Sequence, residues 1–332
     1  MTICVFGAGS IGCYVGGRLA AATAAEVTFV GRGSMQETVA DGMRLVALDG
    51  ESLTVTPDFT TDADAVRNAD LVMVTVKSGA NSAVAEQLRP LLAEDAVVLN
   101  LQNGLHGGAD LRAGLPGHRV ITGMVGFNVV RDGASFQQTT AGGIMAAADP
   151  VWNRYAEAFA GAGVPVEQRS DMDAVLRAKL LLNLNNSINA LSGLPLRAEL
   201  GIRDFRRCLS LAQLEALRVM KRSGPAPAKL TGLSPALMAR ALQVPDPLFR
   251  RLGAKVLAIG PTARSSMADD LAAGRPTEVD WINGAVVDLA AATGTEAPVN
   301  ARLVSLVHDA ERAIHPVWGG RELLTELRSV VG

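Results

Sequence analysis

The chain has 332 residues, enough for two domains of ordinary size, and 48% of them are hydrophobic, so a large core is available. A formal net charge of −2 excludes the basic surface that nucleic-acid binding needs. There is no apolar run of 18 residues and no basic region ahead of an apolar one, so we expect neither a membrane span nor a signal peptide. The three cysteines are scattered and form no CxxC pair, which favours a reducing, cytoplasmic compartment and no bound metal.

A glycine-rich turn stands between two short apolar runs, residues 2–6 and 27–32, that predict buried strands. The turn consists of Gly7, Ala8, Gly9, Ser10, Ile11 and Gly12. Strand, turn, helix and strand in this order are typical of a dinucleotide-binding unit. Gly7 would allow the tight turn, Gly9 would let the backbone approach a pyrophosphate, and Gly12 would let the helix close on the strand. The alternative is an ordinary turn with incidental glycines.

The end of the second strand indicates which dinucleotide binds. NAD-specific sites usually have Asp or Glu there to hold the ribose 2′-hydroxyl, but this strand is followed by Arg32. A guanidinium suits a 2′-phosphate, so we expect NADP(H). The alternative is that Arg32 is only a solvated strand end.

Two later strands also end in polar residues. The strand at 68–77 ends at Lys77, and the strand at 96–104 ends at Asn103 and Gly104. Open α/β sheets bind ligands at the carboxyl ends of their strands. Lys77 could meet the adenosine phosphate or be a solvated lysine. Asn103 could position the nicotinamide or the substrate, or serve only a common Asn-Gly turn.

Further strands are expected in the first half of the chain. Residues 45–57 predict a hairpin through Asp49-Gly50, and residues 119–130 predict another strand pair. After Asp171 the pattern changes to long helical periods without strand-like runs. We therefore predict an α/β fold, with a Rossmann-type dinucleotide-binding domain at 1–170 and an all-helical domain at 171–332.

The predicted helix at 177–191 carries an unusual set of polar residues among leucines. At about 100° per residue, Lys179, Asn183 and Asn186 fall within roughly 60° of one another, and Ser187 lies at one margin of that arc. An ammonium and two amides on one face indicate a polar pocket cut into a core. The alternative is a helix–helix interface with hydrogen-bonded amides and a lysine that reaches solvent.

The segment before the predicted helix at 278–293 contains a second candidate. Thr277 and Asp280 resemble a capping box, the reciprocal side-chain cap of a helix N-terminus. Glu278 could then be an ordinary first-turn acid that suits the helix dipole. Farther upstream, residues 223–247 are rich in turn residues and predict loops around one short helix at 234–242.

Together these motifs resemble those of the ketopantoate reductase (2-dehydropantoate 2-reductase) family. The matching segments are GAGSIG at 7–12, VTVKS at 74–78, QNG at 102–104, KLLLN at 179–183, SSM at 265–267 and TEVDWING at 277–284. The resemblance implies a Rossmann domain joined to a helical domain of the 6-phosphogluconate-dehydrogenase-like type. It also implies NADPH-dependent reduction of a 2-oxo acid to a 2-hydroxy acid in a cleft between the domains.

The resemblance also assigns roles to residues. Lys179 matches the family's general acid, and Glu278 matches the glutamate that binds the substrate hydroxyls. Asn103 matches the amide at the domain cleft.

Further positions match binding residues of the family. Asn183 and Ser266 match substrate-binding positions, while Arg32 and Lys77 match residues near the adenosine phosphate.

Two positions depart from the family pattern. Where the family often has Asn eight residues after the lysine, this chain has Ser187, with Asn186 beside it, and we take both as substrate-binding candidates. A polar family position ahead of Ser265 is here Ala263. Both departures concern the substrate rather than the hydride chemistry.

The sequence thus predicts a reductase of a small-molecule 2-oxo acid, foremost ketopantoate to pantoate in pantothenate biosynthesis. A lysine ammonium would stabilise the negative charge that forms on the substrate oxygen and donate the proton. An apolar setting would lower its pKa, whereas a carboxylate close by would favour the charged form, so the sequence alone does not predict the final pKa. The alternatives are a reductase of another branched or bulky 2-oxo acid and an NADP(H)-binding sensor without catalysis. We expect no nucleic-acid or membrane partner, and a homodimer remains open.

Overall fold

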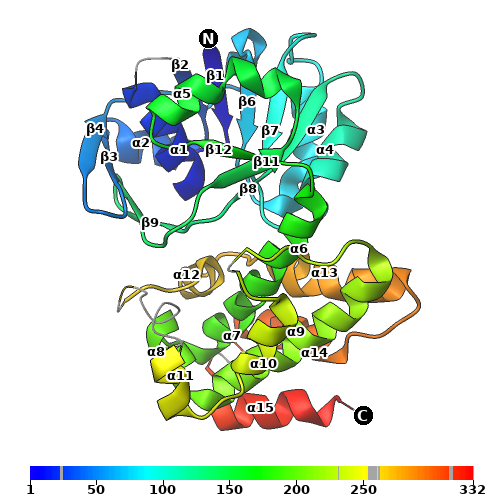
Figure 1. The fold of residues 1–332 in the computed structure, drawn as a ribbon. Helices are drawn as coiled ribbons and strands as arrows, with labels where there is room; N and C mark the ends of the chain where they lie inside the picture. The colour runs from blue at the N-terminus through cyan, green and yellow to red at the C-terminus, as the bar shows by residue number, and fades with distance from the viewer. Residues whose placement is uncertain (23–24, 231, 253–259, 261, 314–316, 332) are drawn as a thin grey trace. The chain divides into compact units, whose positions relative to one another are not determined.

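The computed structural model describes residues 1–22, 25–230, 232–252, 260, 262–313 and 317–331. They form two compact units, Met1–Met172 and Asp173–Gly332 (Figure 1). In the described part of the chain, no helix is long and apolar enough to cross a membrane. All three cysteines are buried and free.

The first unit is built on an eight-stranded sheet. Its strands are β1 (Thr2–Phe6), β2 (Glu26–Val30), β5 (Asp58–Thr60), β6 (Leu71–Val74), β7 (Val97–Asn100), β8 (Arg119–Val125), β11 (Ile144–Ala147) and β12 (Val166–Arg169). The order across the sheet is β12-β11-β8-β7-β6-β1-β2-β5. From β8 to β5 all neighbours are parallel, whereas β11 runs antiparallel to β8. Counted along the chain, the parallel strands follow the 3-2-1-4-5-6 order of a Rossmann fold, which confirms the predicted fold class.

Apolar residues cover both faces of this sheet. Along β1, Ile3 and Val5 belong to one hydrophobic cluster, while Cys4 and Phe6 belong to another. Neighbouring side chains of a strand point to opposite faces, so the two clusters are the two layers of core beneath the helices (Figure 1). The helices of this unit are α1 (Ser10–Ala21), α2 (Gly33–Val39), α3 (Asn81–Leu88), α4 (Gly107–Gly114) and α5 (Ala156–Gly161), with 3₁₀ turns η1 (Ala63–Asn68), η2 (Ser78–Ala80) and η3 (Pro150–Arg154).

A second, four-stranded sheet has the order β4-β3-β10-β9. Its strands are β3 (Met43–Val46), β4 (Ser52–Val55), β9 (Val129–Asp132) and β10 (Ser135–Gln138). The antiparallel pair β3 and β4 confirms the predicted hairpin. The predicted strand pair at 119–130 is wrong, because β8 and β9 belong to different sheets. The chain leaves the larger sheet at Gly126, whose N–H donates to the carbonyl of Gly143 at 2.8 Å.

The second unit contains only helices among its described residues. They are α6 (Met172–Asn183), α7 (Asn185–Ser192), α8 (Leu196–Gly201), α9 (Arg203–Ser223), α10 (Pro235–Ala241), α11 (Asp246–Leu252), α12 (Ser266–Ala272), α13 (Val279–Ala292), α14 (Pro298–Glu311) and α15 (Gly320–Ser329). The long helix α9 contacts α7, α8, α10, α13, α14 and α15, so it forms the centre of this unit (Figure 1). Helix α7 packs on α12 and α14.

Two predictions for this unit need correction. The helix expected at 177–191 is divided at Leu184 into α6 and α7, although the Leu184 N–H still donates to the Leu180 carbonyl at 3.0 Å. The segment at 223–247 contains the expected short helix as α10, but α11 already begins inside it at Asp246. Residue 231 of that segment lies outside the described residues.

Candidate active site

The turn between β1 and α1 needs glycine at two positions. Gly7 has a φ of +104°, and a Cβ there would lie 2.5 Å from Cγ1 of Val76. A Cβ on Gly12 would lie 2.5 Å from Oγ1 of Thr75. Both contacts are far inside van der Waals distance, so a side chain at either position would force the turn open. The first glycine serves the turn, and the last lets α1 approach the sheet.

The backbone at the start of α1 is open to a ligand. A Cβ on Gly9 would meet nothing closer than 3.9 Å, and no side chain caps the helix at this residue. The first N–H groups of an α-helix, here those of Ser10 and its successors, have no carbonyl partner within the helix. These groups and the helix dipole suit an anion. The turn therefore fits the pyrophosphate of a dinucleotide.

Arg32 follows β2 and is exposed at the residue that precedes α2. Its carbonyl accepts from the N–H groups of Met35 and Gln36, so the backbone is fixed while the guanidinium faces solvent. Ser34, also exposed, lies two residues on. A guanidinium and a hydroxyl at this strand end suit a phosphate.

The structure brings the segments of Lys77 and Asn103 together. They follow the neighbouring parallel strands β6 and β7. The Gln102 amide donates to the Lys77 carbonyl at 3.3 Å, and the Ser78 hydroxyl donates to the Asn103 carbonyl at 2.7 Å. Lys77 is exposed and Asn103 is half-buried. Gly104 has a φ of +91°, so turn geometry also explains the Asn-Gly pair.

Lys179 lies on α6 and is half-buried. Ala178 and Leu180, which flank it in the chain, are buried. Burial removes water from the ammonium and lowers the pKa of Lys179 to about 8. The side chain therefore still carries a proton at neutral pH but releases it far more readily than a surface lysine does.

The polar residues that follow Lys179 differ in accessibility. Asn183, one turn later, is buried and ends α6. Asn186 is half-buried on α7. Ser187 is fully buried, and its hydroxyl donates to the Leu184 carbonyl at 3.1 Å. The Ser187 hydroxyl is therefore already hydrogen-bonded within its own helix and is not accessible to a ligand.

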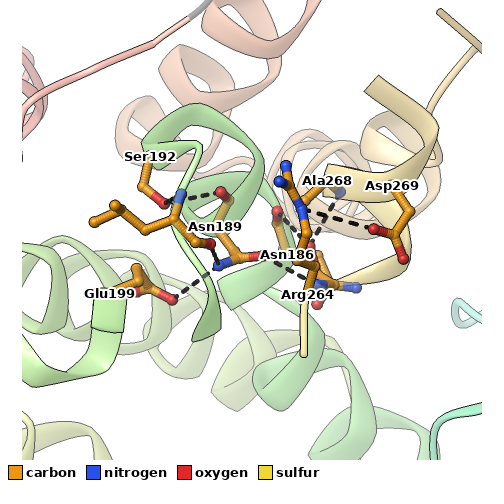
Figure 2. A network of polar contacts seen from close by, with 9 residues as sticks. Asn186, Asn189, Ser192, Glu199, Arg264, Ala268 and Asp269 are labelled. Atoms are coloured by element: carbon orange, nitrogen blue, oxygen red, sulfur yellow. Dashed lines mark hydrogen bonds and ion pairs between the residues drawn. The ribbon is translucent and has the colours of Figure 1, made fainter. Parts of the chain in front are cut away.

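Asn186 and Ser266 are brought together by Ser265, the residue that caps α12. The Ser265 hydroxyl donates to the Asn186 carbonyl at 3.3 Å and accepts from the Ala268 N–H at 3.1 Å (Figure 2). Ser266 is the exposed first residue of α12. Ala263 contributes only its backbone, with its carbonyl accepting from the Leu196 N–H at 2.8 Å.

Glu199, which the sequence analysis did not identify, is hydrogen-bonded to two asparagines of α7. Glu199 on α8 is fully buried and accepts from the side-chain amides of Asn185 at 3.0 Å and Asn189 at 3.4 Å. Burial raises the pKa of Glu199 to about 8. Buried amides in an apolar helix need partners. Glu199 is the first acidic residue after these asparagines, and that position was the signal that could have identified it.

Glu278 is buried at the residue that precedes α13, a helix that begins differently from the prediction. The expected capping box is wrong. The Thr277 hydroxyl accepts from the Val279 N–H at 3.4 Å, and the Thr277 N–H donates to the Glu311 carboxylate of α14 at 2.8 Å. A partner from a distant helix replaced the local one that the spacing suggested.

Matches to family models cover most of the chain. Residues 3–149 match the model described as Ketopantoate reductase PanE/ApbA, and residues 171–311 match its C-terminal counterpart. The chain belongs to the ketopantoate reductase family. This is a family of 2-dehydropantoate 2-reductase oxidoreductases, which confirms the resemblance read from the sequence motifs.

Individual relatives of the ketopantoate reductase family match over nearly their full length. The 2-dehydropantoate 2-reductase of Halobacterium salinarum is 32% identical, over 94% of this chain and 99% of the relative. That of Mesorhizobium japonicum is 28% identical, over 92% and 97%. The crystal structure of a ketopantoate reductase from Ralstonia eutropha has a TM-score of 0.79 at 30% identity, covering 95% of this chain and 99% of the other. A D-mandelate dehydrogenase solved with NADH and anilino(oxo)acetate shares the fold at 17% identity and a TM-score of 0.74.

A histidine contacts the first turn of α13, next to Glu278. His308 contacts Glu311 through Nδ1 at 2.9 Å and Asp280 through Nε2 at 3.0 Å. The hydrogen bond to Glu311, and then that to Asp280, raises the pKa of His308. Among the described residues, no group of three or more His, Cys, Asp or Glu side chains could hold a metal ion.

The His308 contact predicts a pH-dependent stability. A pKa raised by folding means that the imidazolium stabilises the fold below the unfolded-state pKa and that this contribution is lost as pH rises through the folded-state pKa. We expect His308→Gln to lower the free energy of unfolding by about 0.5 kcal/mol at pH 5.5, because solvent screens the pair, and by less at pH 9. Urea denaturation of both proteins at both pH values measures this. His106→Gln, at an exposed histidine, is the control; an equal loss at both pH values for His308→Gln would contradict the assignment.

Proposed function

We propose that this protein catalyses the NADPH-dependent reduction of 2-dehydropantoate (ketopantoate) to pantoate in pantothenate biosynthesis. The observation that carries the proposal is Lys179, a half-buried lysine of a reductase-family chain whose pKa burial lowers to about 8. Reduction of a ketone requires a donor that stabilises negative charge on the oxygen and then supplies a proton. A lysine with a pKa near the working pH is suited to both tasks.

Residues of the first unit would hold the cofactor. The N–H groups of residues 10–12 would bind the pyrophosphate, since the Gly9 N–H already donates to the Gly7 carbonyl at 2.7 Å. Arg32 and Lys77 would bind the phosphate on the adenosine ribose. Bound NADPH supplies the hydride. Asn103 would orient either the nicotinamide amide or the substrate carboxylate with its own amide. These assignments rest on the open backbone at Gly9 and on the position of all three side chains after parallel strands.

Residues of the second unit would hold the 2-oxo acid. Lys179 donates a hydrogen bond to the oxygen of the keto group, and Glu278 accepts from the substrate hydroxyl. Asn183 and Asn186 offer amide groups, and Ser266 offers an exposed hydroxyl at the start of α12. Ser187 is left out of direct contact because its hydroxyl is buried and bound to Leu184.

A substrate panel tests the proposed acid against its alternative, another branched or bulky 2-oxo acid. Initial rates with ketopantoate, a smaller branched 2-oxo acid and an aromatic one, all with NADPH, give kcat/KM for each. We expect the highest kcat/KM with ketopantoate. A higher value for another acid would keep the reaction type and reassign the substrate.

The preference for NADPH over NADH should depend on Arg32. A charge-assisted hydrogen bond contributes about 1.5–3 kcal/mol, so Arg32→Ala should raise the KM for NADPH about 10- to 100-fold and leave the KM for NADH nearly unchanged. Steady-state kinetics with both cofactors measures the two values. Arg44→Ala, at an exposed arginine of β3, is the matched control. An equal change for both cofactors would contradict the phosphate contact.

Assembly as a homodimer in the cytoplasm is the remaining part of the proposal. A ketopantoate reductase from Staphylococcus aureus that shares the fold, at 17% identity and a TM-score of 0.71, is described as dimeric. Light scattering of the purified protein tests the homodimer directly. A mass near twice that of the chain is expected, and the mass of a monomer would contradict the proposed dimer.

A further inference from the structure

Glu199 is a fully buried carboxyl group to which the reaction assigns no role. One of its oxygens, Oε2, accepts from the amides of Asn185 at 3.0 Å and Asn189 at 3.4 Å. The other, Oε1, has no hydrogen-bond partner among the described residues. A buried charge without an opposite charge beside it is costly. Burial raises the pKa of Glu199 to about 8, so at neutral pH the group is mostly protonated and uncharged.

The carboxyl group of Glu199 and the carbonyl of Leu194 together fix which way the Asn189 amide faces. The Nδ2 group of Asn189 donates to the Leu194 carbonyl at 2.9 Å as well as to Glu199. An amide has one donor end and one acceptor end. With its donor end turned to these two oxygens, Asn189 must direct Oδ1 the other way, where it accepts from the Ser265 N–H at 2.9 Å (Figure 2).

Ser265 links this hydrogen-bond network to the residues proposed to bind the substrate. It caps α12, and its hydroxyl also donates to the carbonyl of Asn186. Ser266, the next residue, presents its hydroxyl at the surface. A shift of the Ser265 backbone would therefore move Ser266 and loosen the contact with α7 at Asn186.

We propose that Glu199 is a positioning residue of the reductase site: it fixes the Asn189 amide, which holds the Ser265 backbone and so places the Ser266 hydroxyl for the 2-oxo acid. This inference rests on the proposed function, because it assumes that Ser266 binds the substrate. Glu199 itself contacts no reactant. Its removal should therefore weaken substrate binding and leave cofactor binding unaffected.

The test compares Glu199→Ala with Glu199→Gln in the full-length protein. Misplacing a binding group by about 1 Å can cost up to about 100-fold, so we expect Glu199→Ala to raise the KM for ketopantoate about 10- to 100-fold, with the KM for NADPH unchanged. Glutamine has nearly the same shape as a protonated carboxyl group and keeps an acceptor oxygen. It should restore the KM to within about threefold of the wild-type value.

Ser192→Ala is the matched control for the loss of a buried hydrogen bond close to Asn189, with which Ser192 shares helix α7. The Ser192 hydroxyl donates to the backbone carbonyl of Asn189 at 2.9 Å and accepts from the Leu194 N–H at 3.1 Å. It makes no hydrogen bond with the side-chain amide of Asn189 among these contacts. We expect this variant to have a lower thermal midpoint and an unchanged KM for ketopantoate. A KM rise equal to that of Glu199→Ala would overturn the proposal, because any loss of stability would then have the same effect.

The double variant Glu199→Ala with Asn189→Ala tests whether Glu199 acts through Asn189. If Glu199→Ala does not fold, Asn189→Ala alone still tests the proposal. Because both residues act through one path, the double variant should have the same KM as Asn189→Ala, not the product of the two increases. If Glu199→Ala, Asn189→Ala and the double variant are all less stable but have an unchanged KM for ketopantoate, the positioning role is overturned. The assignment as a reductase would still stand. Failure of the wild-type protein to reduce any 2-oxo acid would instead overturn both.

Discussion

Replacing Lys179 by alanine should lower kcat for 2-oxo acid reduction about 10²- to 10⁴-fold, the range that a positioned general acid contributes. The variant loses both the stabilisation of charge on the substrate oxygen and the proton that follows. NADPH binding should persist, because the residues proposed to hold the cofactor lie in the first unit. Stopped-flow and steady-state measurements of NADPH oxidation give kcat, and NADPH fluorescence gives cofactor affinity.

The pH profile adds a second signature of Lys179. The protonated form is the active one in the reductive direction, so kcat/KM should fall as pH rises through about 8, the pKa to which burial lowers this lysine. Lys221→Ala, at an exposed lysine of α9, is the matched control and should leave both rate and profile unchanged. Turnover by Lys179→Ala near that of wild type would show that another group supplies the proton.

Glu278 should give the second large effect. Removing a hydrogen bond to a charged group costs about 1.5–3 kcal/mol, so Glu278→Gln should lower kcat/KM for ketopantoate about 10- to 100-fold. The substitution keeps the shape of the side chain, and its effect should be smaller for a 2-oxo acid that lacks the hydroxyl group. Kinetics with both acids measures the difference.

The control for Glu278 lies on the same helix. Asp288→Asn removes an exposed carboxylate of α13 and should leave both kcat/KM values unchanged. An equal loss for the two acids in Glu278→Gln would contradict a contact with the substrate hydroxyl and would favour a general electrostatic role.

The fold of the first unit was largely predictable from sequence because its determinants are local. Gly7 and Gly12 occupy positions where a side chain has no room, and the apolar runs correspond to strands buried on both faces. The hairpin at Asp49-Gly50 likewise follows from turn chemistry. The hairpin of β9 and β10 carries the same signal in Asp132-Gly133 and was missed. The partners of β8, which are β7 and β11, were not predictable because no local turn joins them to β8.

In the second unit, the decisive contacts join residues distant in sequence. The leucines around Lys179 indicated an apolar setting, but only the structure shows that burial lowers the pKa of this lysine. Helical spacing placed Asn186 on the polar face and Ser187 at its margin, but it could not show that Ser187 is fully buried. Nor could it show that Asn189 turns its acceptor oxygen to Ser265, 76 positions away. Such contacts depend on how helices pack, which local patterns do not specify.

Loss of NADPH absorbance when the purified protein is mixed with ketopantoate, with NADH in a parallel reaction, is the most direct test of the proposed reaction. We expect rapid oxidation of NADPH, a clearly lower kcat/KM with NADH, and formation of pantoate in an amount equal to the NADPH consumed. Binding of NADPH without oxidation by ketopantoate or any other 2-oxo acid would contradict it and would favour a cofactor-binding sensor.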